Sequence, residues 1–459
     1  MFAPSTPSEA DLSAQFNRVI QASEPFASPL SSPVVRRLPH GLTIIAEQMP
    51  ADAVNLGLWL NVGSRVESDA INGMAHFLEH MIFKGTPQIN QGEFERQVEA
   101  RGAVMNAATS QDYTHFYITT APQDFAALAP LQVELVINPT LGDIHFEREK
   151  PVILEEIRRA EDSPARRAFY RSMKMGFDTL PYRRPVLGPT RVVESLSAAQ
   201  MRAFHHTWYQ PQNMTAVVVG NLPVEEMIAT VVDSFEQALA KSDRQHANPD
   251  LIAQAPSTQP EAPFPTIYRQ THTDEALQQA RLIISWRAPG MCNLEQTYPL
   301  DVAAYVLGQG RTARLVDDLL EQQHLVSDIS VRNMTYGNQG LFYISATIAT
   351  ASSIEAGLAA TETAILAHIA RLHETPIDPN ELNRVKTQVA NRYVFASETP
   401  SDRAGIYGYH QAITGDVRHA LNYPESIRQV SAEDVRSAVR KYLPLDAYGV
   451  VSLKPAAEA

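Results

Sequence analysis

The chain has almost no cysteine and no long apolar run, and each shortage excludes a class of protein. Among 459 residues there is one cysteine, Cys292, so neither an internal disulfide nor a thiolate metal cluster can form. No stretch reaches the roughly 18 continuous apolar residues that a membrane span requires. The sequence therefore predicts a chain without a membrane span, and its core must be built from ordinary apolar side chains.

Basic residues are also in short supply. Lys and Arg number 38 against 51 Asp and Glu, so the net charge is 38 − 51 = −13, and the pI is about 5.6. Such an acidic chain is a poor candidate for binding nucleic acid, because affinity for the phosphate backbone depends on basic side chains. Apolar residues make up 44% and charged residues 19%, which excludes collagen-like and wholly disordered chains.

The first 35 residues are rich in Ser, Pro and Ala, and we expect a flexible arm there. A short helix around Glu9–Ala22 and a plain tail fit this composition equally well. The arm has neither the basic region nor the apolar region of a secretory signal. We therefore expect a cytoplasmic protein, with the periplasm as the alternative if a signal has been removed.

A second change of composition predicts two domains. Residues 243–265 contain five prolines among Ala, Gln and Ser, which is typical of an interdomain linker. The linker separates residues 36–242 from residues 266–459. The halves repeat each other weakly, because a Ser-Ala pair begins at Ser197 and again at Ser431, in each case followed by a Tyr, a Pro and a valine run at similar spacing. A helix that begins after a Ser cap, followed by a turn and a buried strand, would give this pattern in both halves.

Each half shows predicted strands followed by predicted helices. In the first half the strands are expected at 42–48, 54–62, 103–109 and 113–121, and the helices at 124–137, 145–161 and 197–208. In the second half the strands are expected at 266–273, 280–287, 328–335 and 341–348, and the helices at 296–307, 353–371 and 378–396. This segregation predicts the α+β class, with two homologous domains that each pack helices on one face of a mainly antiparallel sheet.

The most informative segment runs from Asn72 to Gly85 and predicts one helix. It contains His76, Glu79 and His80 at i, i+3 and i+4, beside a stripe of apolar residues. This spacing brings two imidazoles within reach of one zinc ion and puts a carboxylate beside them. Glu79 would then act as general base toward a metal-activated water. The order H-x-x-E-H is the inverzincin motif, although two surface histidines on a plain helix are the simpler interpretation.

A third protein ligand must come from elsewhere in the chain. The best source is the predicted helix 143–162, in which Glu149 and Glu156 are seven residues apart and share a face. Glu155 points about 100° away from Glu156. Periodicity alone leaves Glu155 and Glu156 as equal candidates, and a solvated acidic helix remains the alternative.

These residues resemble the M16 (pitrilysin-like) metallopeptidases, in particular the two-domain subfamily that includes the β subunit of mitochondrial processing peptidase and bacterial heterodimeric peptidases. The segment from Gly73 to Thr86 looks like the zinc helix of that family almost residue for residue. The family's distal ligand is a glutamate about 76 residues after the second histidine, and 156 − 80 = 76, so the resemblance selects Glu156. It also implies a supporting role for Glu149 without metal contact.

The resemblance has further implications for fold and substrate. It extends from about residue 35 onward and implies two halves that face each other across a clamshell chamber. Asn106 and Ala107 look like the family's edge strand, on which a peptide binds as an added strand. The second half fits more loosely, as a duplicated domain without the metal motif.

One departure from the family pattern points to a partner subunit. Active members carry an Arg and a Tyr, seven residues apart, that grip the substrate from the second domain. Those positions fall on Leu320 and Ser327 here, and neither side chain can replace a guanidinium or a phenol. We therefore expect a heterodimer, in which a homologous subunit supplies the Arg/Tyr pair.

The leading interpretation is a zinc-dependent endopeptidase with one zinc ion per chain, acting on peptides or unfolded segments. The alternative is a non-catalytic scaffold or assembly subunit of the same fold. The complete set of His76, His80, Glu156 and Glu79 favours the enzyme, whereas the missing Arg/Tyr pair keeps the alternative open.

Overall fold

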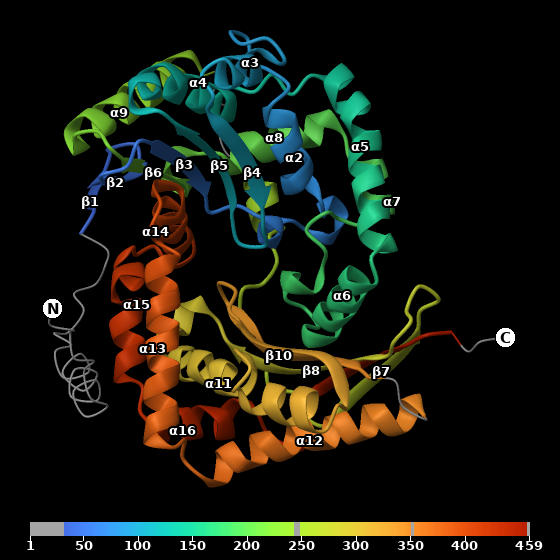
Figure 1. Cartoon of the computed structure of the whole chain (residues 1–459). Helices are drawn as coiled ribbons and strands as arrows, with labels where there is room; N and C mark the ends of the chain where they lie inside the picture. The colour runs from blue at the N-terminus through green and yellow to red at the C-terminus, as the bar shows by residue number, and fades with distance from the viewer. Residues whose placement is uncertain (1–31, 243–247, 350–352, 457–459) are drawn as a thin grey trace, which may run out of the picture.

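The computed structural model describes residues 32–242, 248–349 and 353–456, and their strands form two separate sheets. The sheets occupy the upper and lower parts of Figure 1. The predicted helix around Glu9–Ala22 lies outside the described residues. Strand β1 (Val34–Arg37) begins within the predicted arm, because Val34 and Val35 pair with β2, so the predicted arm boundary is two residues too late.

The first sheet has the strand order β1-β2-β6-β3-β5-β4, antiparallel except for the parallel pair β2 and β6. Its other strands are β2 (Thr43–Gln48), β3 (Val54–Leu60), β4 (Val104–Thr109), β5 (Thr114–Thr120) and β6 (Met214–Gly220). The helices of this half are α2 (Met74–Ile82), α3 (Glu93–Glu99), α4 (Phe125–Ile137), α5 (Asp143–Asp162), α6 (Pro164–Gly176), α7 (Thr190–Ser195), α8 (Ala198–Trp208) and α9 (Val224–Lys241).

The second sheet has the order β7-β11-β8-β10-β9, again with one parallel pair, β7 and β11. Its strands are β7 (Tyr268–Thr273), β8 (Arg281–Pro289), β9 (Val326–Met334), β10 (Gln339–Ile348) and β11 (Gly449–Lys454). The helices are α11 (Tyr298–Gly308), the π-helical segment η7 (Val316–Gln322), α12 (Ile354–Glu374), α13 (Pro379–Phe395), α14 (Pro400–Thr414), α15 (Arg418–Gln429) and α16 (Ala432–Tyr442).

The two orders match strand for strand when β1 is set aside, which confirms the predicted α+β class with two related, mainly antiparallel sheets. The predicted Ser-capped helices are also present. Ser197 and Ser431 each begin a helix, α8 and α16, with a capping box in which the serine side chain accepts from a backbone N–H. Each helix leads to a central strand, β6 or β11.

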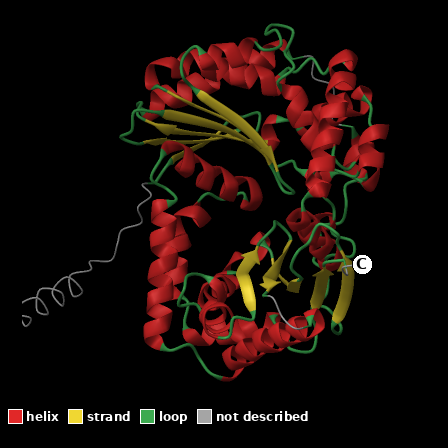
Figure 2. Cartoon of the chain, turned by 45° about the vertical axis from the view of Figure 1, so that its right-hand side comes forward, coloured by secondary structure: helices red, strands yellow, loops and turns green. Residues whose placement is uncertain are grey.

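Each sheet is covered on both faces, and one cover comes from the other half. Figure 2 shows helices both above and below the upper sheet. The helices of the same half pack on one face of each sheet. In β6, Val218 faces those helices, whereas Val217 and Val219 face α14 of the second half, because successive side chains of a strand point to opposite sides. Helix α6 of the first half packs in the same way on Val451 and Leu453 of β11.

The two exchanged helices are built alike. Each begins with Pro after a hydroxyl cap, Ser163 for α6 and Thr399 for α14. Four residues after each cap, an arginine reaches the opposite half: Arg167 pairs with Asp274 at 2.5 Å, and Arg403 pairs with Glu47 at 2.6 Å. This exchange joins the halves through two reciprocal ion pairs, for which the sequence contains no local signal.

The linker segment is held to both halves. Its described part contains the short helix α10 (Pro249–Ala253), and residues 243–247 lie outside the described ranges. The Glu261 carboxylate accepts backbone N–H groups from Asp178 and Leu180 at 2.8 and 2.7 Å and pairs with Arg287 at 2.8 Å. Over the described ranges, we find no helix with both the length and the apolar character to cross a bilayer.

Candidate metal centre

Helix α2 buries its apolar stripe and leaves its polar side chains on one side. Met74, Phe77 and Leu78 are fully buried, whereas the side chains of His76 and His80 remain 12% and 21% exposed. The Phe77 ring stacks on Phe146 of α5 at 4.4 Å between centroids. This contact fixes α2 against the helix that carries the predicted third ligand.

The start of α2 is held by a carboxylate from outside the helix. Gly73 precedes the helix with φ of 102°, a left-handed conformation that suits glycine. The Glu67 carboxylate accepts hydrogen bonds from the backbone N–H groups of Gly73 and Ala75 at 2.9 and 2.7 Å and from Asn72 Nδ2 at 2.8 Å. Burial raises the pKa of Glu67 to about 7, although these hydrogen bonds oppose the shift. Sequence reasoning missed Glu67, because a cap six to eight residues upstream matches no capping box.

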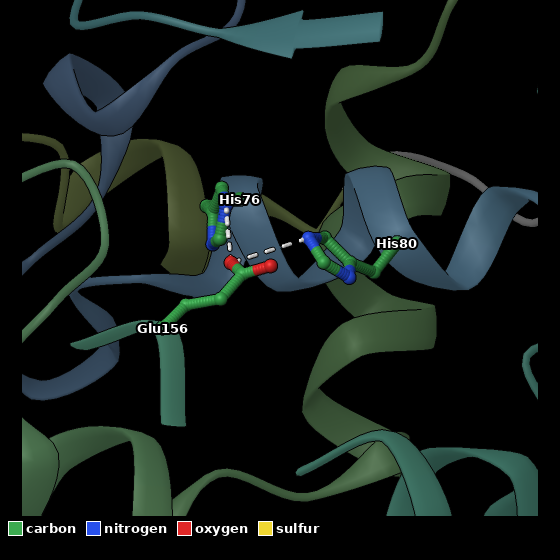
Figure 3. A group of neighbouring side chains, drawn as sticks. All are labelled: His76, His80 and Glu156. Carbon is green, nitrogen blue, oxygen red and sulfur yellow. Dashed lines mark ion pairs between the residues drawn. The ribbon is translucent and has the colours of Figure 1, made fainter. Parts of the chain in front are cut away.

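The structure brings His76, His80 and Glu156 together (Figure 3). Glu156 Oε2 lies 3.6 Å from Nε2 of each histidine. One donor atom from each residue can be chosen so that all three lie within 4.8 Å of one another. Two ligand atoms on a tetrahedral zinc ion lie roughly 3.4 Å apart, so these donors fit such an ion.

The protonation states suit metal binding. Burial, with a smaller contribution from His80, lowers the pKa of His76 to about 3, so its imidazole is neutral near pH 7. A neutral imidazole is the form that ligates zinc. The donor set of two imidazoles and one carboxylate therefore fits zinc in both geometry and chemistry.

Glu155, the other candidate that periodicity had left open, points away from this group. Its carboxylate pairs with Arg158 at 2.8 Å and with Arg159 at 3.0 Å. These hydrogen bonds hold the pKa of Glu155 near 2. Of the two neighbouring glutamates, Glu156 alone lies at the histidines.

Glu149 contacts a histidine from the side opposite Glu156. Its Oε1 lies 3.0 Å from His80 Nδ1, and its Oε2 lies 2.6 Å from Lys84 Nζ. Partial burial opposes ionisation of Glu149, but the hydrogen bonds from Lys84 and His80 lower its pKa overall. A carboxylate on Nδ1 directs Nε2 of the same ring toward the metal position.

Glu79 lies on the same helix between the two histidines and contacts the edge strand. Thr109, the last residue of β4, donates its hydroxyl to Glu79 Oε2 at 2.6 Å. Burial raises the pKa of Glu79, although the Thr109 hydrogen bond opposes this shift. A raised pKa makes a carboxylate a stronger base, which suits general-base catalysis.

Asn106 and Ala107 lie on β4, which is the last strand of the first sheet and pairs with β5 alone. The Asn106 side chain accepts a hydrogen bond from the Ala107 N–H at 2.9 Å. The structure thus places both residues on a strand that has one open edge among the described residues. Their contact with substrate stays a prediction.

The positions predicted to lack the Arg/Tyr pair lie in the second half. Leu320 is half-buried in η7, and Ser327 is exposed on β9, where its hydroxyl hydrogen bonds Gln279. Arg314, the nearest arginine before them, is held by Glu381 at 2.6 Å.

Two family models match the chain. Residues 42–190 match the model described as "Insulinase (Peptidase family M16)", and residues 195–389 match "Peptidase M16 inactive domain". An uncharacterized zinc protease of Mycobacterium tuberculosis is 27% identical over 94% of this chain and 95% of its own length. A Helicobacter pylori protein named zinc protease PqqE is 24% identical over 91% of this chain and 92% of its own length.

Solved structures share the fold across nearly the whole chain. A protease from Helicobacter pylori gives a TM-score of 0.82 at 23% identity and covers 93% of this chain and 100% of its own. A chain of complex III2 from Candida albicans gives a TM-score of 0.74 at 16% identity, covering 92% and 95%. At these identities the likeness concerns the fold.

Proposed function

The chain belongs to the M16 family of zinc metallopeptidases, and on that premise we propose that it is an endopeptidase that hydrolyses peptides or unfolded polypeptide segments with one zinc ion per chain. The observation that supports this proposal most is that His76, His80 and Glu156 lie together. Glu79 lies on the same helix as the two histidines. These residues come from two distant segments, α2 and α5. If the histidines of α2 were incidental surface residues, there would be no reason for a carboxylate of α5 to lie at both of them.

In this proposal each side chain has a separate task. His76, His80 and Glu156 hold the zinc ion, which when bound polarises a carbonyl group and lowers the pKa of water. Glu79 takes a proton from the attacking water and later gives it to the leaving amine. Thr109 holds Oε2 of Glu79, which leaves Oε1 for the proton. Glu149 orients the His80 ring and takes no direct part.

The substrate lies along the open edge of β4 as an added strand, with Asn106 and Ala107 at the backbone contacts. Thr109 at the end of β4 joins this edge to Glu79, so a peptide paired with β4 passes beside the general base. The Asn106 side chain must leave the Ala107 N–H when the peptide binds there.

The purified chain should contain about one zinc ion and should cut an unfolded peptide. Glu79→Gln should retain the zinc but lose at least ~100-fold in kcat, because it removes the general base. Glu147→Gln on α5, an exposed carboxylate paired with Lys150, is the control and should change neither quantity. A metal-free chain that tolerates Glu79→Gln would instead favour the scaffold or assembly role.

We also propose that the active form is a heterodimer with a homologous subunit that carries an Arg and a Tyr seven residues apart. The support is the pair Leu320 and Ser327, which cannot hold a carbonyl or an oxyanion. Peptide hydrolysis should be slow with the chain alone and rise severalfold or more when the partner is added. Full activity of the isolated chain would contradict the heterodimer and leave the peptidase proposal intact.

A further inference from the structure

The second half has a cavity at the place where the first half has its metal centre. In the first half, α2 and α5 follow β3 and precede α6 along the chain, and they contact each other (Figure 1). In the second half, α11 and α13 follow β8 and precede α14, and they too contact each other. The first residues of α6 and α14 are 400 − 164 = 236 apart, and those of α5 and α13 are also 379 − 143 = 236 apart. By this offset Arg392 of α13 corresponds in sequence to Glu156 of α5, since 156 + 236 = 392. A cavity of about 310 Å³ lies between these helices.

The lining of this cavity differs from that of the metal centre. It contains one carboxylate, Asp301 of α11, together with four tyrosines, namely Tyr305, Tyr393, Tyr409 and Tyr423. The Tyr393 and Tyr423 rings stack at 5.1 Å. Thr335, directly after β9, lines it too, as Thr109 at the end of β4 does for the metal centre.

Asp301 has hydrogen bonds but no cation. Asn333 Nδ2 donates to Oδ1 at 2.8 Å, and the Tyr423 hydroxyl donates to Oδ2 at 3.2 Å. Within the residues that the structure describes, no ion pair of Asp301 is found, and Arg392 at the rim is exposed and bonds Gln309 instead. A carboxylate in an aromatic cavity without a cation is unusual, because buried charges are normally paired.

Three of the four tyrosine hydroxyls of the wall already donate to other atoms of the chain. The Tyr393 hydroxyl donates to the Ala420 carbonyl at 2.5 Å, the Tyr409 hydroxyl donates to the Thr335 carbonyl at 3.4 Å, and the Tyr423 hydroxyl donates to Asp301. His410, 8% exposed, also lines the cavity, and its Nδ1 has no hydrogen-bond partner. Apart from the hydroxyls of Tyr305 and Thr335 and the exposed Arg392 guanidinium, the wall offers a ligand acceptors and aromatic faces, which together attract a donor-rich cation.

We propose that this cavity is a binding site for an alkylammonium or alkylguanidinium group, with Asp301 as its counter-ion and the tyrosine rings as its walls. The duplicated half thus binds an organic cation at the place where the first half binds a metal ion. Such a group could belong to a Lys or Arg side chain of a peptide or to a free diamine. The first source rests on the proposed function, and the second does not.

The first experiment measures binding to the purified full-length chain by calorimetry near pH 7.5. N-acetyl-lysine amide and N-acetyl-norleucine amide differ in the ammonium group, so their difference isolates the cation. The lysine probe should bind at least tenfold more tightly, and Asp301→Asn should remove the preference. No preference in the wild-type chain, or an intact preference in a folded Asp301→Asn variant, would overturn the site.

A second variant tests the same site if the Asp301→Asn variant fails to fold. Ala396 is exposed at the rim of the cavity, directly after α13, so Ala396→Trp narrows the entrance without touching Asp301. It should weaken binding of the lysine probe severalfold or more, while Ala359→Trp, on an exposed face of α12, should not. Unchanged binding in Ala396→Trp would count against the cavity as the binding place.

Two further arms identify the source of the cation. If peptide side chains occupy the cavity, a lysine-containing substrate should have a lower KM than its norleucine analogue, and Asp301→Asn should remove that difference with kcat unchanged. If a free diamine is the ligand, cadaverine should bind tightly while the KM values of the two peptides agree. Probe binding is measured without hydrolysis, so an inactive chain would leave the cation site standing, and a failed site would leave the peptidase standing.

Discussion

The two halves share one scaffold and differ at one place within it. Apart from the additional strand β1 of the first sheet, both have the same strand order. Each also has a Ser-capped helix before an inner strand and a helix that packs on the sheet of the other half. Between corresponding helices, the first half places His76, His80 and Glu156, and the second places Asp301 among tyrosines. Duplication therefore preserved the packing, which many apolar sequences satisfy, while the chemistry of the site changed through a few side chains.

The largest expected effect tests whether metal binding belongs to the first half alone. Glu156→Gln should lower zinc affinity by at least ~100-fold, because it removes one of the three proposed protein ligands and its charge. Glu155→Gln, one residue away on α5 and directed at Arg158 and Arg159, should leave zinc affinity unchanged. Zinc competition with a coloured chelator measures both variants.

Equal zinc affinity in Glu156→Gln and the wild-type chain would place the metal elsewhere. Arg392→Gln, at the corresponding position of the second half, completes the comparison and should not alter zinc content. A loss of zinc in that variant would mean that the second half also contributes to metal binding.

The next effect concerns the exchanged helices, which differ in how deeply their ion pairs are buried. Arg403 and Glu47 are 12% and 4% exposed at their side chains, and the Tyr407 hydroxyl also donates to Glu47 at 2.6 Å. Arg403→Met leaves Glu47 buried without this cation, which should cost about 3–5 kcal/mol of unfolding free energy. The variant with both Arg403→Met and Glu47→Gln should recover part of that loss.

The reciprocal pair provides the matched control. The Asp274 and Glu47 side chains are equally buried, at 4% exposed, but Arg167 is more exposed than Arg403, at 23% against 12%. After Arg167→Met, Asp274 keeps a hydrogen bond from the Ala276 N–H and the nearby charge of Arg171, so this variant should cost less than Arg403→Met. Chemical denaturation of both variants measures the difference. A larger loss in Arg167→Met would show that burial does not rank the two junctions between the halves.

The sequence predicted the scaffold well where local signals repeat. The strands around Val217 and Val450 and the serine caps at Ser197 and Ser431 appear as expected, because alternation and capping act over a few residues. The exchange of α6 and α14 was missed, because periodicity shows that a strand such as β6 is apolar on both faces but not which distant helix covers it.

Some residues of the candidate site could be predicted from the sequence and others could not. The i, i+3, i+4 spacing indicated His76, Glu79 and His80, since one helix places them. Choosing Glu156 over Glu155 needed either the family spacing or coordinates, because adjacent residues on a helix differ only in direction. The cavity around Asp301 left no signal, because its lining residues come from separate helices and follow no motif.

The smallest expected effect concerns the N-terminal cap of α2, the helix that carries His76 and His80. The two halves also differ at this point. Helix α2 is capped by the buried Glu67, whereas α11 begins after Thr297 without a side-chain cap. Glu67→Gln keeps the size of the side chain but turns an N–H toward the donors of Gly73 or Ala75. Because the proposed metal ligand His76 follows Ala75 directly, zinc affinity should fall about tenfold, the lower end of the range for residues that support metal ligands.

Asp301→Asn separates this local effect from a general loss of stability. Asp301, like Glu67, is a carboxylate whose pKa burial raises, to about 6. The Asp301 variant should lower the melting temperature without changing zinc affinity, since α11 does not contact the metal centre, whereas Glu67→Gln should change both. If the two variants affected zinc affinity equally, Glu67 would support the fold as a whole, and the position of His76 would depend on α5 and the Phe77–Phe146 stack instead.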